Sequence, residues 1–492
     1  MKRFVTAGHP ENQGWLLPPS VDEFVAQDAP VRLFAHVIDQ LDLGYLRDAH
    51  KGGGRPAYDP VVMLKVLIFG MTLGIRSSRR LEDALLYDLR FKFLAHMATP
   101  DYRTIARFRA ASESVLADVF VKTVRLARKQ GLVSLEHVSV DGTKIAANAG
   151  KRQCRSAEEL DAGIAKVDKI AAELLKEWKQ NDERDATDNN DQSSEGDPPK
   201  RIRTFMHRKK RLEEAKSKLE ESGDKTIIVT DDESRMIKTS GIIRPAYNAQ
   251  AVVDADNQII IAAQVCQDQA DNAQLPPMMD LAKENTGVHP DRVSADGGYW
   301  SHATLDYVER EKLDAYIAPS GGVQEDLESW TYDATKNEFI GPDGLIYKYV
   351  RTESRTKTHG YHIFGNEETG KLRRFRQDHQ KVTPMALKIR TPAGKAVYSK
   401  RKTIIEPVFG HLKGSYGMSR LLLRGLTGAS VEFRMACIAH NIAKLVGKGS
   451  FFSSVGATKR LLYSLLSRNS HRLPTLTLRH NALRLLTAQM PT

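Results

Sequence analysis

Two short stretches of the chain nearly repeat each other, and each contains an aspartate at the same place. His137–Gly142 reads HVSVDG, and Arg292–Gly297 reads RVSADG. Both have the pattern of a β-strand that ends where glycine turns the chain. If the two strands lie parallel and adjacent, Asp141 and Asp296 meet at one edge of the sheet, where open α/β sheets place their sites.

Two carboxylates at close range repel each other unless a cation lies between them. Hard oxygen ligands suit Mg²⁺, and Mn²⁺ is expected to substitute for it. A third carboxylate, Glu406, stands in a helical and basic segment. Hydrolysis of a phosphodiester needs a deprotonated nucleophile and a stabilised leaving oxygen, and two divalent ions about 4 Å apart supply both. We therefore predict Asp141, Asp296 and Glu406 as catalytic metal ligands that act on nucleic acid, with Asp141 bridging two ions.

Basic and aromatic residues surround Glu406. Lys413 lies seven residues after it, on the same face of a helix, and is expected to reach a phosphate beside the metal site. Tyr398 and Arg401 lie on the preceding turns and are predicted to hold the nucleic-acid backbone. Pro407 is awkward inside a helix, so we expect the helix to start or bend there.

The composition favours a polyanionic partner. The 492 residues carry a net charge of +12, with a pI of about 9.3, which suits DNA or RNA, although solubility alone also explains it. The three cysteines form no CxxC or CxxH pair, which argues against a disulfide framework or a zinc finger. No apolar run could span a bilayer, and the first residues lack the apolar core of a signal peptide. We expect a cytoplasmic protein that associates with the bacterial nucleoid and not with a membrane.

Residues 1–130 are predicted to be mostly helical, with a buried core helix at Pro60–Leu73. A basic turn follows this helix, and another helix with interleaved arginines and aromatic residues begins at Pro100. The predicted contacts to nucleic-acid backbone in these segments are Arg76, Arg79, Arg80 and Arg107. For the basic turn, a solvated helix cap is an equally good reading.

The rest of the chain alternates strands and helices. The predicted elements are a strand ending at Asp141, strands at Tyr247–Asp254 and Gln258–Val265, a helix from Leu275, a strand ending at Asp296, a helix at His302–Lys312 and a strand at Ala315–Ala318. This order predicts a mixed sheet of the ribonuclease H kind over residues 131–445. Residues 156–220 read as a helical hairpin insertion with a disordered tip at 181–200, residues 320–397 as a second insertion with short strands, and residues 446–492 as a basic tail.

Other polar and aromatic residues receive structural roles. Asp254 is assigned to a hairpin turn, Asp271 to a helix cap, and Tyr299 with Trp300 to core packing. His411 has no visible partner for proton transfer.

Together these segments resemble bacterial insertion-sequence transposases of the DDE type. The stretches 54–60, 74–82 and 104–109 are similar to the helical domain that opens these proteins, while 140–144 and 295–299 are similar to their first and second catalytic strands. Tyr398, Arg401, Glu406 and Lys413 match the Tyr-Arg-Glu-Lys signature. The likeness covers about residues 15–445.

The resemblance implies a fold class of α+β or α/β type. It consists of a ribonuclease H-like mixed sheet with helical and β insertions, preceded by an all-helical amino-terminal domain. It further implies Mg²⁺-dependent cleavage at inverted-repeat DNA ends, strand transfer into target DNA, and a homo-oligomer of at least two protomers.

The sequence departs from the family pattern at two places. Four residues separate Arg401 from Glu406, where the signature has three, and Tyr361–Glu367 lacks the cysteine cluster of many relatives, so no zinc is expected. Two alternatives remain open from the residues alone. They are a catalytically inactive DNA-binding relic or regulator, and a stand-alone nuclease of ribonuclease H-like fold.

Overall fold

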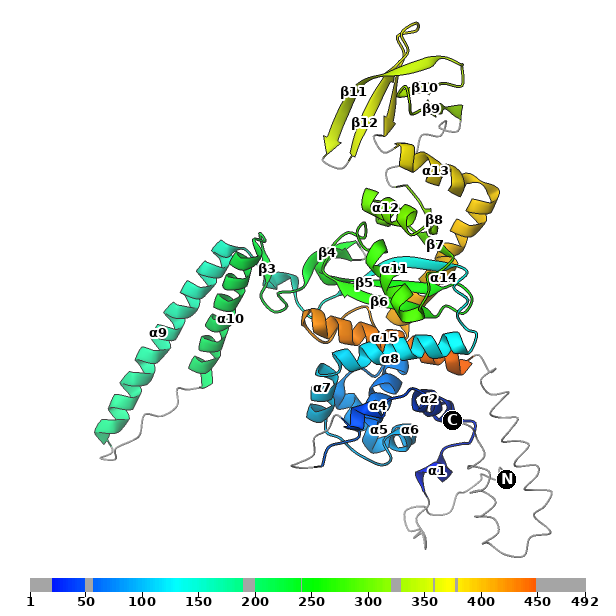
Figure 1. Cartoon of the computed structure of the whole chain (residues 1–492). Coiled ribbons are helices and arrows are strands. Elements are labelled where there is room, and N and C mark those ends of the chain that lie inside the picture. Colours follow the sequence, from blue (N-terminus) through cyan, green and yellow to red (C-terminus); the bar gives the residue numbers. More distant parts are fainter. Residues whose placement is uncertain are drawn as a thin grey trace, which may run out of the picture.

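The computed structural model describes residues 20–48, 56–188, 200–239, 241–319, 329–356, 359–376 and 379–447. Figure 1 shows a body of helices and a sheet, from which a long helical hairpin and a separate small sheet extend. The predicted tail at 446–492 lies outside the described residues from 448 onward. In the part of the chain that the structure describes, no helix is long and apolar enough to cross a membrane.

The first 130 residues form helices where they are described, as predicted. The helices are α1 (Val21–Phe24), α2 (Pro30–Asp39), α3 (Tyr45–Asp48), α4 (Pro60–Thr72), α5 (Ser78–Tyr87), α6 (Leu89–Leu94), α7 (Tyr102–Ala110) and α8 (Glu113–Lys129). Helix α4 confirms the expected core helix, because nearly every side chain on it is buried. Its start is fixed locally, since Pro60 occupies the first turn and Asp59 accepts the amide of Val61 at 2.8 Å.

The central sheet contains six strands. They are β1 (Val138–Ala146), β4 (Arg235–Thr239), β5 (Ile242–Asp254), β6 (Ile260–Cys266), β7 (Arg292–Ala295) and β8 (Asp314–Ile317). The order is β4-β5-β1-β7-β8, with β6 also paired to β5. Strands β1, β7 and β8 run parallel, whereas β4, β5 and β6 pair antiparallel. The predicted hairpin of β5 and β6 is confirmed, and Asp254 accepts the amide of Asp256 in its turn at 3.1 Å.

Helices cover this sheet and join it to the amino-terminal helices. They are α11 (Leu275–Thr286), α12 (His302–Arg310), α13 (His379–Arg390), α14 (Pro392–Gly414) and α15 (Gly425–Gly447). Helix α14 contacts β1, β7 and β8, while α8, α11 and α15 contact β6. Helix α15 also packs on α2, α4 and α8, so the helical block and the sheet share one hydrophobic core.

A buried ion pair also stabilises the contact between the helical block and α15. The Arg76 guanidinium lies 3.2 Å from the Glu432 carboxylate of α15, and it also donates to the carbonyls of Gly417 and Arg420. Both charged side chains are less than a tenth exposed. Arg76 therefore ties the turn before α5 to the carboxyl-terminal part of the chain, and this contact argues against its expected place on a DNA-binding surface.

Two insertions extend from the body (Figure 1). Helices α9 (Ala157–Asp188) and α10 (Lys200–Ser222) form the predicted hairpin. The expected disordered tip at 181–200 is wrong at its edges, because α9 continues to Asp188 and α10 begins at Lys200, and residues 189–199 lie outside the described residues. The hairpin has its own small apolar core, and α10 lysines pair with α9 carboxylates, as in Lys209–Asp168 and Lys216–Asp161, each at 2.6 Å. These pairs join the two helices of the hairpin. Two short strands, β2 (Cys154–Arg155) and β3 (Ile227–Ile228), pair at its base.

The second insertion is a five-stranded antiparallel sheet around an aromatic core. Its strands are β9 (Thr331–Asp333), β10 (Glu338–Ile340), β11 (Ile346–Thr356), β12 (His359–Gly365) and β13 (Leu372–Arg376). The rings of Phe339 and Phe375 stack at 3.7 Å, and Trp330 meets both edge-on. The expected short strands are therefore present, and they bury their rings against one another.

Helix α14 runs through Pro407 and begins fifteen residues before it, so the helix does not start at this proline. Proline lacks the N–H that would bond the carbonyl of Thr403. That carbonyl instead accepts the Gln258 side-chain amide at 3.1 Å. One turn later, His411 meets His440 of α15 with 3.1 Å between their Nδ1 atoms, so His411 does have a partner.

We predict that Glu432→Ala lowers the free energy of unfolding by about 3–5 kcal/mol, because it leaves the buried Arg76 guanidinium unpaired. Urea unfolding measures this loss. Glu432→Gln keeps an acceptor and should cost less, while Glu309→Ala on the exposed face of α12 is the matched control. A loss below about 1 kcal/mol for Glu432→Ala would show that the pair contributes no more than an exposed one.

Candidate active site

Asp141 and Asp296 lie side by side because of strand register. Strands β1 and β7 are parallel, and Val140 pairs with Ala295, so the next residue on each strand is an aspartate. The three residues before Asp141 on β1 are buried, whereas the Asp141 side chain is 20% exposed. Asp296 ends its strand and accepts the amide of Gly298 at 2.8 Å, which caps the short 3₁₀ turn Gly297–Tyr299. The predicted convergence of the two strand ends is present.

The pKa of Asp141 is raised to about 6 by its burial and by the neighbouring carboxylate. Burial is the largest cause, and the negative charge of Asp296 is the second; the amide of Gly142 and the Arg401 guanidinium act in the opposite direction. Arg401 Nη1 lies 3.3 Å from Asp141 Oδ2. A pair of hard oxygen donors whose charges oppose each other is the kind of site that a divalent cation stabilises.

Helix α14 presents three of the four signature side chains to these aspartates. Arg401 is buried and contacts Asp141, and its guanidinium lies 5.9 Å from the centre of the half-buried Tyr398 ring. Burial raises the pKa of Tyr398, on which Asp296 and Asp141 also act. Burial lowers the pKa of the Lys413 ammonium, and the charge of Asp141 partly offsets that effect.

Glu406 lies on the exposed side of α14. The buried face of this helix carries Arg401, Ile405 and Val408. At 3.6 residues per turn, a separation of five residues turns Glu406 about 140° away from Arg401, whereas the usual four would give about 40°. Among the described residues, no three His, Cys, Asp or Glu side chains form a group that could hold a metal ion. The structure thus joins Asp141 and Asp296 without Glu406.

Asp271 is a site residue that the sequence analysis missed. Its Oδ1 atom accepts from Lys144 Nζ at 2.8 Å, from Asn248 Nδ2 at 2.8 Å and from Gln250 Nε2 at 2.6 Å. The expected helix cap is wrong, because the side chain turns to the sheet instead of the start of α11. The available signal was the pair Asn248 and Gln250, two amides at alternate positions of an otherwise apolar strand that are fully buried.

The remaining predicted nucleic-acid contacts lie on the surface of the helical block. Arg79 and Arg80 on α5 and Arg107 on α7 are exposed, and the Arg79 guanidinium lies 5.1 Å from the centre of the Tyr102 ring. Tyr299 and Trp300 are buried, in agreement with the expected packing role.

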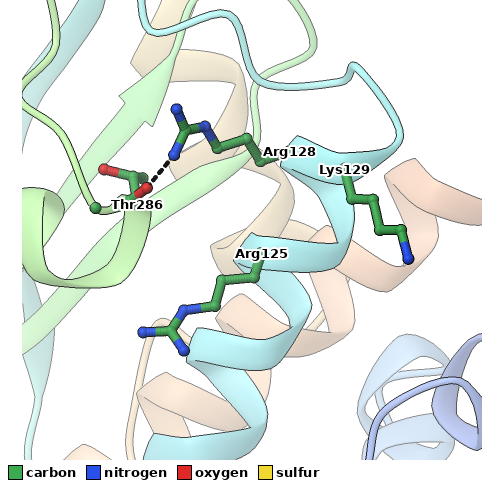
Figure 2. Close-up of a pocket in the computed structure, with 5 residues that line it drawn as sticks. Arg125, Arg128, Lys129 and Thr286 are labelled. Atoms are coloured by element: carbon green, nitrogen blue, oxygen red, sulfur yellow. Dashed lines mark hydrogen bonds between the residues drawn. The ribbon is translucent and has the colours of Figure 1, made fainter.

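A basic pocket of about 430 Å³ lies at the end of α11 far from Asp271, lined by Arg125, Arg128, Lys129, Thr286 and Gly287. In Figure 2, Arg128 reaches across to the Thr286 carbonyl, whereas Lys129 points away from it. Arginines near a helix carboxyl end satisfy carbonyls that have no partner within the helix. The pocket therefore has a structural reading, in which Arg128 anchors α8 to the end of α11.

We predict that Gly142→Ala destabilises the protein by about 1–3 kcal/mol through overpacking. A Cβ at Gly142 would lie 2.3 Å from Gln250 Nε2 and 2.8 Å from Asp271 Oδ1. Gln250 is buried and also binds Tyr299, so it has little freedom to move. Gly150→Ala, which meets nothing within 4 Å, is the control, and urea unfolding compares the two variants. Equal effects of the two substitutions would contradict the close packing.

Two family models match this chain. The family described as Transposase domain (DUF772) matches residues 19–111, and the family described as Transposase DDE domain matches residues 224–442. The second match contains Asp296 and Glu406, while Asp141 lies between the two matched regions, before the helical hairpin. No curated protein sequence gave a significant match.

Among solved structures, a piggyBac transposase synaptic complex with hairpin DNA matches 94% of this chain and 85% of its own, with 11% identity and a TM-score of 0.30. Two transposase family models match the chain, one over the helical block and the other over residues 224–442, which include β7 and Asp296. The chain therefore belongs to the insertion-sequence DDE transposases, which cleave DNA and transfer its strands.

Proposed function

We propose that Asp141, Asp296 and Glu406 are the catalytic carboxylates of this transposase and that they act with Mg²⁺, for which Mn²⁺ substitutes. The observation that carries the proposal is the register of β1 and β7, which places the two aspartates side by side and, with the partial burial of Asp141, raises the pKa of Asp141 to about 6. A bound divalent ion would supply Lewis-acid activation of water or a 3′-hydroxyl and stabilise the leaving oxygen. The reactions would be cleavage at the inverted-repeat ends of the element and strand transfer into target DNA.

The chain's own residues have separate roles in this proposal. Arg401 balances the charge of Asp141 when no cation is present, since its guanidinium lies 3.3 Å from the carboxylate. Lys413 and Tyr398 lie in the field of the aspartates, where they are suited to hold a DNA phosphate. Glu406 is on the same helix but faces solvent. Its entry into the ligand set therefore requires part of α14 to turn, and Pro407 is the weak point in its hydrogen bonding.

The proposed fold of residues 131–445 is ribonuclease H-like. Three strands of the central sheet are parallel, with Asp141 on β1 and Asp296 directly after β7, and the antiparallel strands β5, β6 and β4 continue the sheet on the other side of β1. Residues 1–130 would form the helical DNA-binding and assembly domain, and residues 446–492 a basic tail. The partner would be DNA in a complex of at least two protomers, because strand transfer joins paired ends. A place in the bacterial cytoplasm at the nucleoid accords with this partner.

The site favours an active enzyme over an inactive relic or regulator. Burying two like charges side by side costs folding free energy. A protein that only binds DNA would gain nothing from Asp141 beside Asp296. The helical block, which matches a transposase domain over residues 19–111, favours recognition of element ends over general digestion by a nuclease.

We predict that Asp141→Asn, Asp296→Asn and Glu406→Gln each abolish cleavage and strand transfer while leaving DNA binding intact. Each removes a charge that the proposed ions require, with little change of shape. The assay incubates each full-length variant with Mg²⁺ and a labelled fragment bearing the element ends, and Glu309→Gln is the exposed control. Cleavage by Asp141→Asn at the wild-type rate would refute the assignment, binding without cleavage by the wild type would favour the regulator, and cutting of unrelated sequences would favour the nuclease.

We further predict that Arg79, Arg80 and Arg107 contact phosphates. Substituting Arg107 by alanine should weaken binding to all sequences alike and reduce the slope of log affinity against log salt concentration by about 1. Fluorescence anisotropy at several salt concentrations measures this slope, and Arg79→Ala and Arg80→Ala are tested in the same way. Lys371→Ala, in the turn between β12 and β13, is the control. An unchanged slope would place the DNA elsewhere.

A further inference from the structure

We infer that Asp271 is a positioning residue of the active site that restrains the Lys144 ammonium and so keeps Asp141 and Asp296 available to a divalent cation. This inference rests on the proposed function. Asp271 is not one of the three proposed ligands, and it comes from the loop before α11, far along the chain from β1.

The contacts of Asp271 account for its restraint of Lys144. Lys144 Nζ is 2.8 Å from Asp271 Oδ1, and the two side chains are each about one-fifth exposed. Asn248 and Gln250 donate to the same oxygen and are fully buried, so they fix the position of the carboxylate. Three donors on one oxygen hold it far more rigidly than a single surface ion pair would.

Two glycines let this carboxylate lie close to the catalytic strands. A Cβ at Gly142, next to Asp141, would be 2.8 Å from Asp271 Oδ1. A Cβ at Gly298 would be 2.9 Å from Asp296 Oδ1 and 3.8 Å from Asp271 Oδ2. Asp271 and Asp296 therefore lie close to the same glycine, and Asp271 binds the Lys144 ammonium through Oδ1 while its Oδ2 lies near Gly298.

A second chain of contacts leads from Asp271 to the turn that Asp296 caps. The Gln250 side chain donates through Nε2 to Asp271 at 2.6 Å, and its amide oxygen Oε1 accepts the hydroxyl of Tyr299. Tyr299 is fully buried and ends the 3₁₀ turn that begins after Asp296. Asp271 thus holds Lys144 on one side and, through Gln250, the backbone beside Asp296 on the other.

The consequence of losing the Asp271 charge follows from simple electrostatics. A lysine side chain is long and flexible, and its ammonium is attracted to whichever carboxylate is near. Without Asp271 as an anion, Lys144 would turn to the aspartate pair and compete with a divalent ion for it. Removing Lys144 as well should then restore cation binding, whereas a purely structural defect would not be repaired in this way.

The test compares wild type, Asp271→Asn, Lys144→Gln and the double variant as full-length proteins. Mn²⁺ binding is measured by electron paramagnetic resonance, and binding of an end-bearing DNA fragment is measured without divalent ions. We expect Asp271→Asn to weaken Mn²⁺ binding by about tenfold, which corresponds to about 1.4 kcal/mol. The double variant should recover to within about threefold of wild type, with DNA affinity unchanged throughout. Asp291→Asn, at an exposed position, is the control.

The outcomes separate this inference from the proposed function. Wild-type Mn²⁺ binding by Asp271→Asn, or no recovery in the double variant, would overturn the inference and leave the catalytic assignment untouched. Absence of Mn²⁺ binding in the wild type would count against both. Urea unfolding of the same four proteins without metal gives a second readout. We expect the effects of the two substitutions on the unfolding equilibrium constant to differ from independence by about fivefold. Independent effects in that cycle would show that Asp271 does not hold Lys144.

Discussion

The parallel pairing of β1 with β7 is the constraint on which the site depends. Once Val140 is opposite Ala295, the next residues on the two strands must lie together, and both are aspartates. Burial of Asp141 and, second to it, the negative charge of Asp296 raise the pKa of Asp141 to about 6. The residues around the two aspartates either balance this negative charge or hold other charged groups apart from it.

Two groups of residues respond to the negative charge of the aspartate pair. Helix α14 brings cations, with Arg401 in contact with Asp141 and Lys413 within its field. From the other side, β5 brings neutral amides, which hold Asp271 and its lysine as a separate pair. The charged groups of the site therefore form two sets, the aspartates with the cations of α14 and the Asp271–Lys144 pair. The two sets can lie close together because positions 142 and 298 are glycines without side chains.

The features that the sequence predicted well are those set by local pattern. A strand that ends in Asp-Gly can be recognised from a few residues, and so can the apolar helix α4. Arg76 could not be assigned, because its partner Glu432 lies 356 residues away and nothing near Arg76 indicates the pairing. Asp271 was misassigned for the same reason, since its partners lie on β1 and β5. The five-residue separation of Arg401 and Glu406 already indicated that the two side chains lie on different faces of a helix. Only the packed helix shows that Arg401 lies on the buried face.

Helix α15 has a consequence for the integrity of the whole protein. Because it fills the space between α2, α4, α8 and β6, the helical block and the sheet do not possess separate interiors. A gene copy that lacked its first hundred codons would leave a large apolar surface of α15 uncovered. Such a fragment would be prone to aggregate and would fail to act as a trimmed DNA-cutting module. Loss of the amino-terminal helices would thus silence the element through folding, before any catalytic residue is altered.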